Sequence, residues 1–327
     1  MTTAIVVSTY NGEKYILRQL ESLIRQTVQP NSVYISDDCS CDKTVEIVRQ
    51  FIKGNNLTNW QLTLNEKNEG WKKNFHNLIS NVDEDIIFLC DQDDIWQNNK
   101  IELMVEQFEL NSKMELLACG YEPFYEDRTR HVLKSITRNM RDTGKVTKIP
   151  CDEYFMNVLR PGCTFAVKKD FCMELEPFWD EQVAHDAILW RFSTIKQTGY
   201  LLDKKLILWR RYESSSSSNH YGKKDGDNEL SIRYKNTINR FNAHFCFYEA
   251  VQKYMITHRI PFDIRQNIGN NLAFEKKYYD AISQCKLFST LKIGIANRQY
   301  FMSNKTIIAD FAMVLYAKLF LKQGKVI

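Results

Sequence analysis

The sequence has 327 residues, of which 44% are hydrophobic and 26% charged, the mixture of an ordinary folded protein. This length is typical of about two domains, and the composition excludes a disordered chain, a collagen-like repeat and a small disulfide-stapled protein. The formal net charge is +4, but residues 286–327 hold seven lysines or arginines against one aspartate, which leaves the preceding residues near −2. We therefore expect no nucleic-acid partner, and a basic C-terminal segment that touches an anionic surface.

Nine cysteines are present, an odd number, and several lie within apolar runs. Cys39 and Cys41 are too close in sequence to bridge easily, and they lack the second pair that a zinc site requires. Reduced thiols in a cytosolic protein are the expected state. There is no signal-peptide pattern after Met1 and no run of about 20 apolar residues. We expect a cytoplasmic protein, soluble or peripheral on the cytoplasmic face of the plasma membrane.

The first hundred residues predict alternating strands and helices. This order is typical of an α/β fold with a mostly parallel sheet and helices on both faces. Ligands bind such sheets beyond the carboxyl ends of the strands. The predicted strands are 4–8, 33–36, 60–64 and 85–90, and the predicted helices between them are 13–26, 43–53 and 71–80.

The rest of the chain divides at a polar stretch rich in serine and glycine. Before it, short strands are expected at 165–167 and 206–208, and after it residues 230–327 have mainly helical patterning. We therefore predict an α/β domain at 1–220 and a helical C-terminal region at 221–327.

An acidic cluster, Asp91-Gln92-Asp93-Asp94, follows a buried strand directly. Carboxylates packed this closely repel each other unless a cation neutralises them, and Mg²⁺ or Mn²⁺ takes oxygen ligands and bridges them to phosphates. The alternative is that Asp94 caps a helix beginning near Ile95. Asp37-Asp38 follows another strand. Either Asp38 accepts a hydrogen bond from a base N–H, or the acidic pair before Ser40 forms a turn or an N-cap.

Four short motifs in this order resemble those of family 2 glycosyltransferases, which have the GT-A fold. The resemblance covers roughly the first 215 residues, and neither GxGxxG nor a P-loop is present. The acidic motif resembles that of the branch that transfers rhamnose from dTDP-L-rhamnose in bacterial surface-polysaccharide synthesis. The motifs are Val7 to Gly12, Asp37 to Ser40, Asn68 to Gly70 and Asp91 to Trp96.

The resemblance implies that 1–220 is a catalytic domain, with residues 1–97 as its nucleotide-binding half and 98–220 as its acceptor half. It also implies roles for individual residues. The strand-end residues would bind the nucleotide, with Tyr10 stacked on the base and Asp38 reading its edge. Asp91 and Asp93 would bind the metal, Asp91 also lying near the ribose. Trp96 would contact the sugar or the acceptor. The residues implied on the nucleotide side are Ser8, Thr9, Tyr10, Asp38 and Asp91.

The second half of the domain carries the expected catalytic base. His185-Asp186 resembles the family's acidic-pair or His-Asp motif, which makes Asp186 the candidate base and His185 a neighbour that orients it or touches substrate. The alternative is that Asp186 caps the helix that follows. Upstream, Gly162-Cys163-Thr164 resembles the segment that lines the acceptor side, where the glycine permits close backbone approach.

One departure from the family pattern concerns a histidine near the metal. Many relatives carry Arg-x-His after a late strand, whereas here Tyr212 stands where the histidine is expected. This leaves Arg210 and Arg211 as candidates for diphosphate contact. His220, in the following loop, is not expected to replace the missing ligand.

The C-terminal segment Lys305 to Lys322 has apolar residues at helical spacing with lysines around them. Such a helix lies on anionic lipid, or it packs on the body or on a second copy in a homodimer. The expected function is inverting, metal-dependent transfer of rhamnose to a glycan acceptor that is lipid-linked. The alternatives are transfer from a UDP-hexose or UDP-N-acetylhexosamine donor, a nucleotidyltransferase, and a noncatalytic scaffold of a polysaccharide assembly complex.

Overall fold

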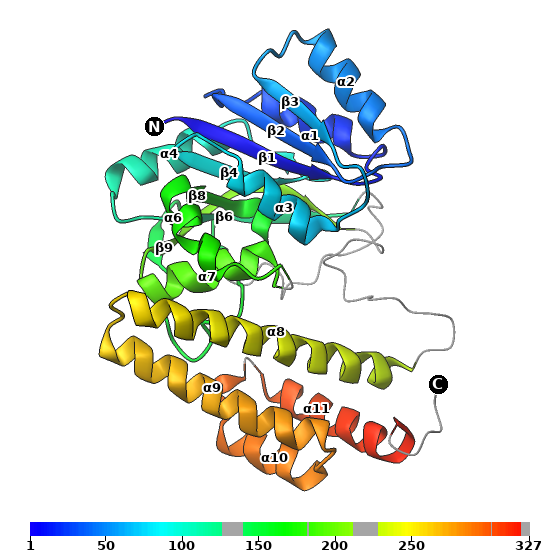
Figure 1. Cartoon of the computed structure of the whole chain (residues 1–327), viewed down its shortest axis with the longest axis vertical. Helices are drawn as coiled ribbons and strands as arrows, with labels where there is room; N and C mark the ends of the chain where they lie inside the picture. The colour runs from blue at the N-terminus through cyan, green and yellow to red at the C-terminus, as the bar shows by residue number, and fades with distance from the viewer. Residues whose placement is uncertain (126–139, 182, 212–227, 302, 322–327) are drawn as a thin grey trace. The chain divides into compact units, whose positions relative to one another are not determined.

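The computed structural model describes residues 1–125, 140–181, 183–211, 228–301 and 303–321 (Figure 1). The chain separates into two compact units. The first comprises residues 1–149 and 158–212, and the second comprises residues 150–157 and 213–327. The predicted boundary at residue 220 lies outside the described residues, so it stays a prediction.

The first unit contains a nine-stranded sheet in the order β3-β2-β1-β4-β8-β6-β9-β5, with β7 paired to β9. Its N-terminal half is parallel, because β1 pairs with both β2 and β4, and β2 pairs with β3. Helices flank this sheet (Figure 1), which confirms the predicted α/β fold class. The strands are β1 (Thr3–Thr9), β2 (Ser32–Asp37), β3 (Trp60–Leu64), β4 (Ile86–Asp91), β5 (Ile95–Trp96), β6 (Leu116–Phe124), β7 (Val146–Lys148), β8 (Phe165–Lys168) and β9 (Gly199–Arg210).

The helices of this unit follow the apolar periodicity of the sequence. In α1 the buried side chains include Ile16, Leu20 and Leu23, which recur every three to four residues and face the sheet. The central strands are apolar on both faces, since Ile5 to Val7 and Ile86 to Cys90 are completely buried. The helices are α1 (Ile16–Ile24), α2 (Thr44–Gly54), α3 (Trp71–Ser80), α4 (Lys100–Leu110), α6 (Lys169–Leu175) and α7 (His185–Lys196), with a 3₁₀ turn at Gly162–Thr164.

The second unit is helical, as predicted for this region, and has its own aromatic core. The segment 150–157 belongs to it: Asn267 donates to the Cys151 carbonyl (2.8 Å), and the Tyr154 hydroxyl donates to the Phe301 carbonyl (3.4 Å). Among the described residues, no helix has the length and hydrophobicity needed to cross a membrane. The helices are α8 (Glu229–Thr257), α9 (Phe262–Ser283), α10 (Leu287–Ala296) and α11 (Asn304–Tyr316), followed by a π-helical turn at Ala317–Leu321.

Candidate functional site

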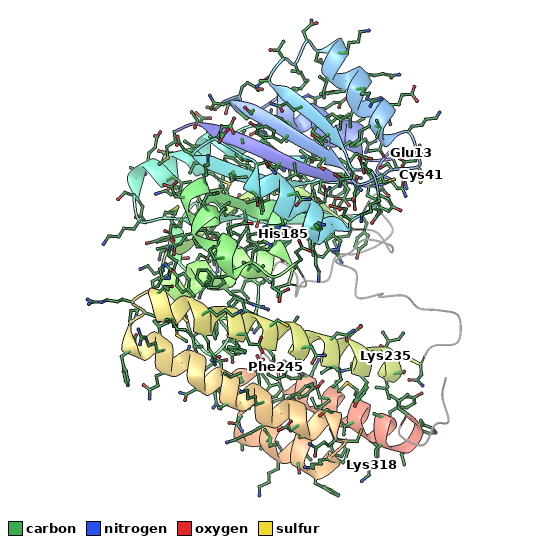
Figure 2. The ribbon with its side chains drawn as sticks, viewed as in Figure 1. Glu13, Cys41, His185, Lys235, Phe245 and Lys318 are labelled. Atoms are coloured by element: carbon green, nitrogen blue, oxygen red, sulfur yellow. The ribbon has the colours of Figure 1, made fainter. Side chains whose placement is uncertain are left out.

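The polar motifs singled out in the sequence meet at one edge of the sheet. Ser8 on β1 is in register with Ser36 on β2 and with Asp91 on β4, so the three strands end together. Glu13 and Cys41, from the loops after β1 and β2, lie next to each other at this edge (Figure 2). The carboxyl ends of parallel strands thus bring the separate motifs into one site.

The loops after β1 and β2 are joined by side-chain to backbone hydrogen bonds. The Asn11 amide donates to Ser40 Oγ (2.8 Å), and the Cys41 amide donates to Asn11 Oδ1 (2.8 Å). The Gly12 amide donates to Thr44 Oγ1 (2.7 Å). Asn11 has a left-handed backbone (φ 47°), a conformation that asparagine tolerates better than most residues. These bonds hold the nucleotide-side loop in one shape before any ligand arrives.

The predicted nucleotide-side residues differ in what they still offer to a ligand. Thr9 Oγ1 donates to Asp37 Oδ2 (2.8 Å), and Ser8 Oγ accepts from Asn74 Nδ2 (2.8 Å). Tyr10 is 45% exposed, so its ring is open to a flat ligand. Asp37 also accepts from the Ser40 amide (2.8 Å), the turn role that was the alternative reading for this acidic pair.

Asp38 fixes the loop that leads into α3. Its Oδ1 accepts from the Glu69 amide (2.8 Å) and from Asn65 Nδ2 (3.0 Å), and its Oδ2 accepts from the Gly70 amide (2.8 Å). Gly70 has a φ of +86°, which favours glycine at this position. A carboxylate has about four acceptor positions; three are used here and Asp38 is 2% exposed, so its contact with a base stays a prediction.

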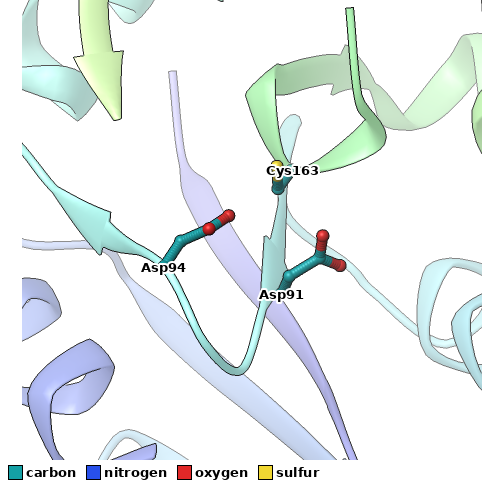
Figure 3. Close-up of side chains that lie close together, drawn as sticks. All are labelled: Asp91, Asp94 and Cys163. Carbon is teal, nitrogen blue, oxygen red and sulfur yellow. The ribbon is translucent and has the colours of Figure 1, made fainter. Parts of the chain in front are cut away.

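Three potential metal-binding side chains converge beyond the end of β4 (Figure 3). They are Asp91, Asp94 and Cys163, whose ligand atoms all lie within 4.8 Å of one another. The predicted ligand Asp93 is outside this group, and its role as a ligand stays a prediction. The alternative that Asp94 caps a helix is wrong, because residues 95–96 form β5, which pairs with β9, and α4 begins only at residue 100.

The electrostatics of this cluster are unfavourable without a cation. Burial raises the pKa of Asp91 to about 7, with the charges of Asp93 and Asp186 adding to the effect. The pKa of Asp94 is raised well above its usual value by burial and then by Asp93 and Asp91. Burial and the carboxylates of Asp94 and Asp91 raise the pKa of the Cys163 thiol as well. The thiol therefore stays protonated, and the carboxylates carry repulsion that a cation would relieve.

A buried lysine lies beneath the acids and was not singled out in the sequence. Lys100 is fully buried; its Nζ donates to the Cys163 carbonyl (3.1 Å) and lies 3.3 Å from the centre of the Trp96 ring. Burial lowers the pKa of Lys100. Trp96 is only 2% exposed and packs in the core, which weighs against the sugar contact expected for it.

Asp186, His185 and Gly162 lie together on the other side of the site. A Cβ on Gly162 would lie 2.8 Å from His185 Nε2 and 3.1 Å from Asp186 Cβ. The N-cap of α7 is Ala184, so Asp186 does not take the capping position; it accepts from the Ala187 amide (2.7 Å) within the first turn. Cys163, the neighbour of Gly162 in the 3₁₀ turn, has its sulfur within 4.8 Å of a carboxylate oxygen of Asp91, so the turn links Asp91 to Asp186.

His185 is buried between aromatic rings. Its ring centroid lies 4.2 Å from that of Phe75 and 5.6 Å from that of Trp71. Burial lowers the pKa of His185 to about 4, against the opposing charge of Asp186, so the imidazole is neutral at physiological pH. His185 Nδ1 is buried without a hydrogen-bond partner among the described residues. Both roles expected for His185, orienting Asp186 and touching substrate, stay predictions.

The remaining predicted contacts have mainly structural partners. Thr164 is completely buried, and its Oγ1 donates to the Pro161 carbonyl (2.7 Å). Arg210 is 2% exposed; its Nε donates to the Asp93 carbonyl (2.7 Å), and its amide donates to Asp94 Oδ1 (3.0 Å). Arg210 thus holds the acidic turn. Arg211 is less buried, with its guanidinium 4.3 Å from the Trp209 ring centre. Tyr212 and His220 lie outside the described residues.

Two amide side chains that organise the site were missed in the sequence. Gln92 Oε1 accepts from the Tyr10 amide (2.9 Å), and its Nε2 donates to the Tyr10 carbonyl (2.9 Å). Asn74, completely buried in α3, donates to Ser8 Oγ and accepts from Ser36 Oγ (2.6 Å). The available signal was position: Gln92 lies inside the acidic motif, and Asn74 lies on the apolar face of its helix.

Polar loops and an acidic cluster at the carboxyl ends of parallel strands are where α/β enzymes bind their ligands. The family model "Glycosyl transferase family 2" matches residues 4–167, half of the chain, and the chain belongs to this family. It is therefore a glycosyltransferase. The dTDP-rhamnosyl transferase RfbG of Shigella flexneri is 31% identical over 221 residues, which cover 64% of this chain and 72% of that protein.

Solved structures share the fold at lower identity. TarS residues 1–349 from S. aureus, in complex with UDP-GlcNAc, has a TM-score of 0.56 and 16% identity, covering 98% of this chain and 92% of that one. The mannosyltransferase PcManGT from Pyrobaculum calidifontis, in complex with GDP-Man and Mn²⁺, has a TM-score of 0.55 and 13% identity, covering 97% and 86%. Both support the predicted GT-A fold.

Proposed function

We propose that this glycosyltransferase moves L-rhamnose from dTDP-rhamnose onto a lipid-linked glycan of a bacterial surface or capsular polysaccharide. The reaction inverts the anomeric carbon and depends on Mn²⁺ or Mg²⁺. The similarity to RfbG, at 31% identity over 72% of that protein, supports the rhamnose donor.

The observation that carries this proposal is the convergence of Asp91, Gly162 and Asp186 from separate segments of the chain. The glycine lets the 3₁₀ turn approach α7 closely, since any side chain would meet Asp186. One acid then lies at the end of β4, at the edge where ligands bind in sheets of this kind, and the other lies against the 3₁₀ turn whose Cys163 is close to the first. A donor and an acceptor would meet between them.

Asp186 acts as the general base in the proposed reaction. As the acceptor oxygen attacks the anomeric carbon, the bond from that carbon to the diphosphate oxygen breaks, and the hydroxyl proton passes to Asp186. The bond from the Ala187 amide to Asp186 Oδ1 fixes the carboxylate, so Oδ2 is assigned to the proton. A single displacement of this kind inverts the configuration.

The acidic cluster fits a hard divalent cation. Asp91 and Asp94 offer carboxylate oxygens, the ligands that Mg²⁺ and Mn²⁺ prefer. Asp94 Oδ2 is buried, and apart from the Cys163 thiol it has no hydrogen-bond donor within reach among the described residues. We assign the cation to Asp91 with Asp94 or Asp93. When bound, it would neutralise charge on the departing diphosphate.

The base-binding side does not separate thymine from uracil. Tyr10 would stack on either ring, and the N3–H that Asp38 would accept is common to both; Arg211 would contact the diphosphate. Transfer from a UDP-hexose or UDP-N-acetylhexosamine donor is therefore the second candidate. It is favoured by the likeness to TarS, whose structure holds UDP-GlcNAc.

The test compares donors and the base. Release of nucleoside diphosphate is measured with dTDP-rhamnose and with UDP-GlcNAc, each with and without Mn²⁺, and nucleotide binding is followed by thermal shift with dTDP, UDP, GDP and CMP. We expect metal-dependent turnover of dTDP-rhamnose, which Asp186→Asn abolishes while dTDP binding persists. Unchanged turnover in Asp186→Asn would refute the base, and preferential turnover of UDP-GlcNAc would select the second candidate.

A further inference from the structure

The helical unit exposes apolar side chains on its last two helices. On α10, Phe288 is 81% exposed and Ile295 is 63% exposed; on α11, Ile308 is 65% exposed and Leu315 is 38% exposed. Leu319, in the turn that follows, is 48% exposed. Isolated exposed apolar residues are common, but a set repeated along two neighbouring helices marks an interaction surface.

These side chains are not needed to hold the helices in place. The opposite faces of α10 and α11 are already packed: a Cβ on Gly294 would lie 2.8 Å from Ile307 Cγ2, and both Met313 and Val314 are completely buried. Substitution of an exposed apolar residue should therefore leave the fold intact. The surface can be altered without destroying the unit.

The two exposed stripes lie on the same side of the helix pair. α10 and α11 run in opposite directions (Figure 1) and pack against each other at Gly294 and Ile307. In each helix the next residue, Ile295 or Ile308, belongs to the exposed stripe. One residue is a turn of about 100° in an α-helix. Because the two helices are antiparallel, a rotation of about 100° from the Gly294–Ile307 contact points to the same side of the pair in both helices. The two exposed stripes therefore form one surface.

Every exposed formal charge on residues 286–321 is positive. The one acid in this range, Asp310, is 1% exposed and accepts from Arg233 Nη2 (2.7 Å) and from the Tyr278 hydroxyl (3.2 Å). Lys318, labelled in Figure 2, lies near the C-terminal end of this region. The exposed cations are Lys286, Lys292, Arg298, Lys305 and Lys318.

We propose that this surface, the α10–α11 face, docks on an anionic lipid bilayer. Bilayers with anionic headgroups offer partners for the lysines and an apolar boundary for the phenylalanine, isoleucine and leucine side chains. A symmetric pairing of two copies through this face would instead bring lysines against lysines, because the same patch meets itself. The proposal goes beyond sugar transfer, since it concerns where the enzyme works.

The test is vesicle sedimentation of the full chain. We expect binding to phosphatidylglycerol/phosphatidylcholine vesicles that exceeds binding to pure phosphatidylcholine and weakens as salt rises. Lys292→Glu or Lys305→Glu should lower the partition coefficient at least about fivefold, which corresponds to about 1 kcal/mol per basic residue near the surface. The double substitution Phe288→Ser with Ile308→Ser should lower it by about tenfold or more.

Matched controls lie elsewhere on the same unit. Ile256 is 83% exposed on α8, and Lys235, labelled in Figure 2, is exposed on the same helix. Ile256→Ser and Lys235→Glu should leave vesicle binding unchanged, and circular dichroism melts establish that all variants fold. Equal binding of variants and unaltered chain, or binding that ignores lipid charge, would overturn the proposal.

A shift in oligomeric state in the α10–α11 variants would also overturn it, by assigning this face to protein contact. Donor hydrolysis by the variants in the absence of vesicles is expected to be unchanged. Failure of lipid docking is therefore distinguishable from failure of the proposed transfer.

Discussion

Gly162→Ala tests whether the close approach of the 3₁₀ turn to α7 matters for transfer. The alanine Cβ would lie 2.8 Å from His185 Nε2 and 3.1 Å from Asp186 Cβ, where ordinary contacts are 3.4 Å or more. One side or the other must move by about 0.6 Å to restore an ordinary contact. Gly162 does not have a positive φ, so the substitution adds bulk without backbone strain.

The neighbours cannot absorb this shift freely. His185 is held between the rings of Phe75 and Trp71, so the displacement passes in part to Asp186 in the same turn of α7. Misplacement of a reacting group by about 1 Å lowers rates by up to about 100-fold, so we expect kcat to fall about tenfold to 100-fold. Overpacking should also lower the free energy of unfolding by about 1–3 kcal/mol.

The assay measures kcat for donor hydrolysis beside dTDP binding and urea unfolding. Binding of dTDP should be largely retained, because the proposed base contacts Tyr10 and Asp38 belong to the loops after β1 and β2 and not to the turn that carries Gly162. Gly269→Ala is the matched control: this glycine lies within α9 with nothing within 4 Å of the added Cβ. It should be neutral, or stabilising by about 0.5–1 kcal/mol. Full kcat in Gly162→Ala would refute the geometry assigned to the base.

Three further outcomes are expected. Burial lowers the pKa of His185 to about 4, below its unfolded value, so its contribution to stability is complete above pH 6.5 and is lost as pH falls toward 4. His185→Phe should remove this pH dependence of the free energy of unfolding, which amounts to up to about 3 kcal/mol. Urea unfolding at several pH values measures it. Lys100→Met removes the buried cation near Asp91 and should lower the metal-free unfolding free energy by roughly 3 kcal/mol, with partial recovery in Mn²⁺; a thermal melt at or above that of the unaltered chain would contradict this. Gln92→Ala releases both bonds to Tyr10 and should weaken dTDP binding about fivefold by calorimetry, whereas an unchanged affinity would show that the loop keeps its shape without them.

The parallel half of the sheet could be predicted because its determinants are local. Strand β1 was expected at 4–8 and spans Thr3–Thr9, and α2 was expected at 43–53 and spans Thr44–Gly54. The central strands β1 and β4 are short apolar runs buried on both faces, and each intervening helix has a clear apolar stripe. The same regularity predicted which motifs would share the edge of the sheet, since parallel strands end together.

The antiparallel half depends on pairing between distant residues and left weaker signals. Strand β9 extends over Gly199–Arg210, yet only residues 206–208 were predicted, because lysines interrupt the apolar pattern in its middle. Strand β5 has two residues and forms only because β9 pairs with it, which is why a helix was expected there instead. Strand β6 pairs with β9 across some eighty residues, and a local pattern cannot show that.

Buried polar residues in helices were missed for a related reason. Lys100 begins α4, and Asn74 lies in α3, where a polar residue usually faces water. The folded structure explains their burial, because it places Lys100 near the acidic cluster and Asn74 against the ends of β1 and β2. The partners of a buried polar group come from other segments of the chain, so composition and periodicity do not single it out.

The carboxylates of the acidic cluster repel each other, and the pH dependence of stability tests this interpretation. The pKa of Asp91 is about 7 in the folded chain against a usual value of 3.8, so between these values the folded state binds more protons than the unfolded state. The contribution of Asp91 to the free energy of unfolding of the metal-free protein should therefore fall as pH rises from about 4 to about 7, opposite in sign to the contribution of His185, so it is measured as the difference between Asp91→Asn and the unaltered chain. A divalent cation at these carboxylates would reverse the effect, because it replaces the proton. The rise in Tm on adding Mn²⁺ should then be larger at pH 8 than at pH 6. Without metal at pH 8, Asp91→Asn should be more stable than the unaltered chain, and Mn²⁺ should raise its Tm much less. A gain independent of pH would mean that Mn²⁺ binds elsewhere.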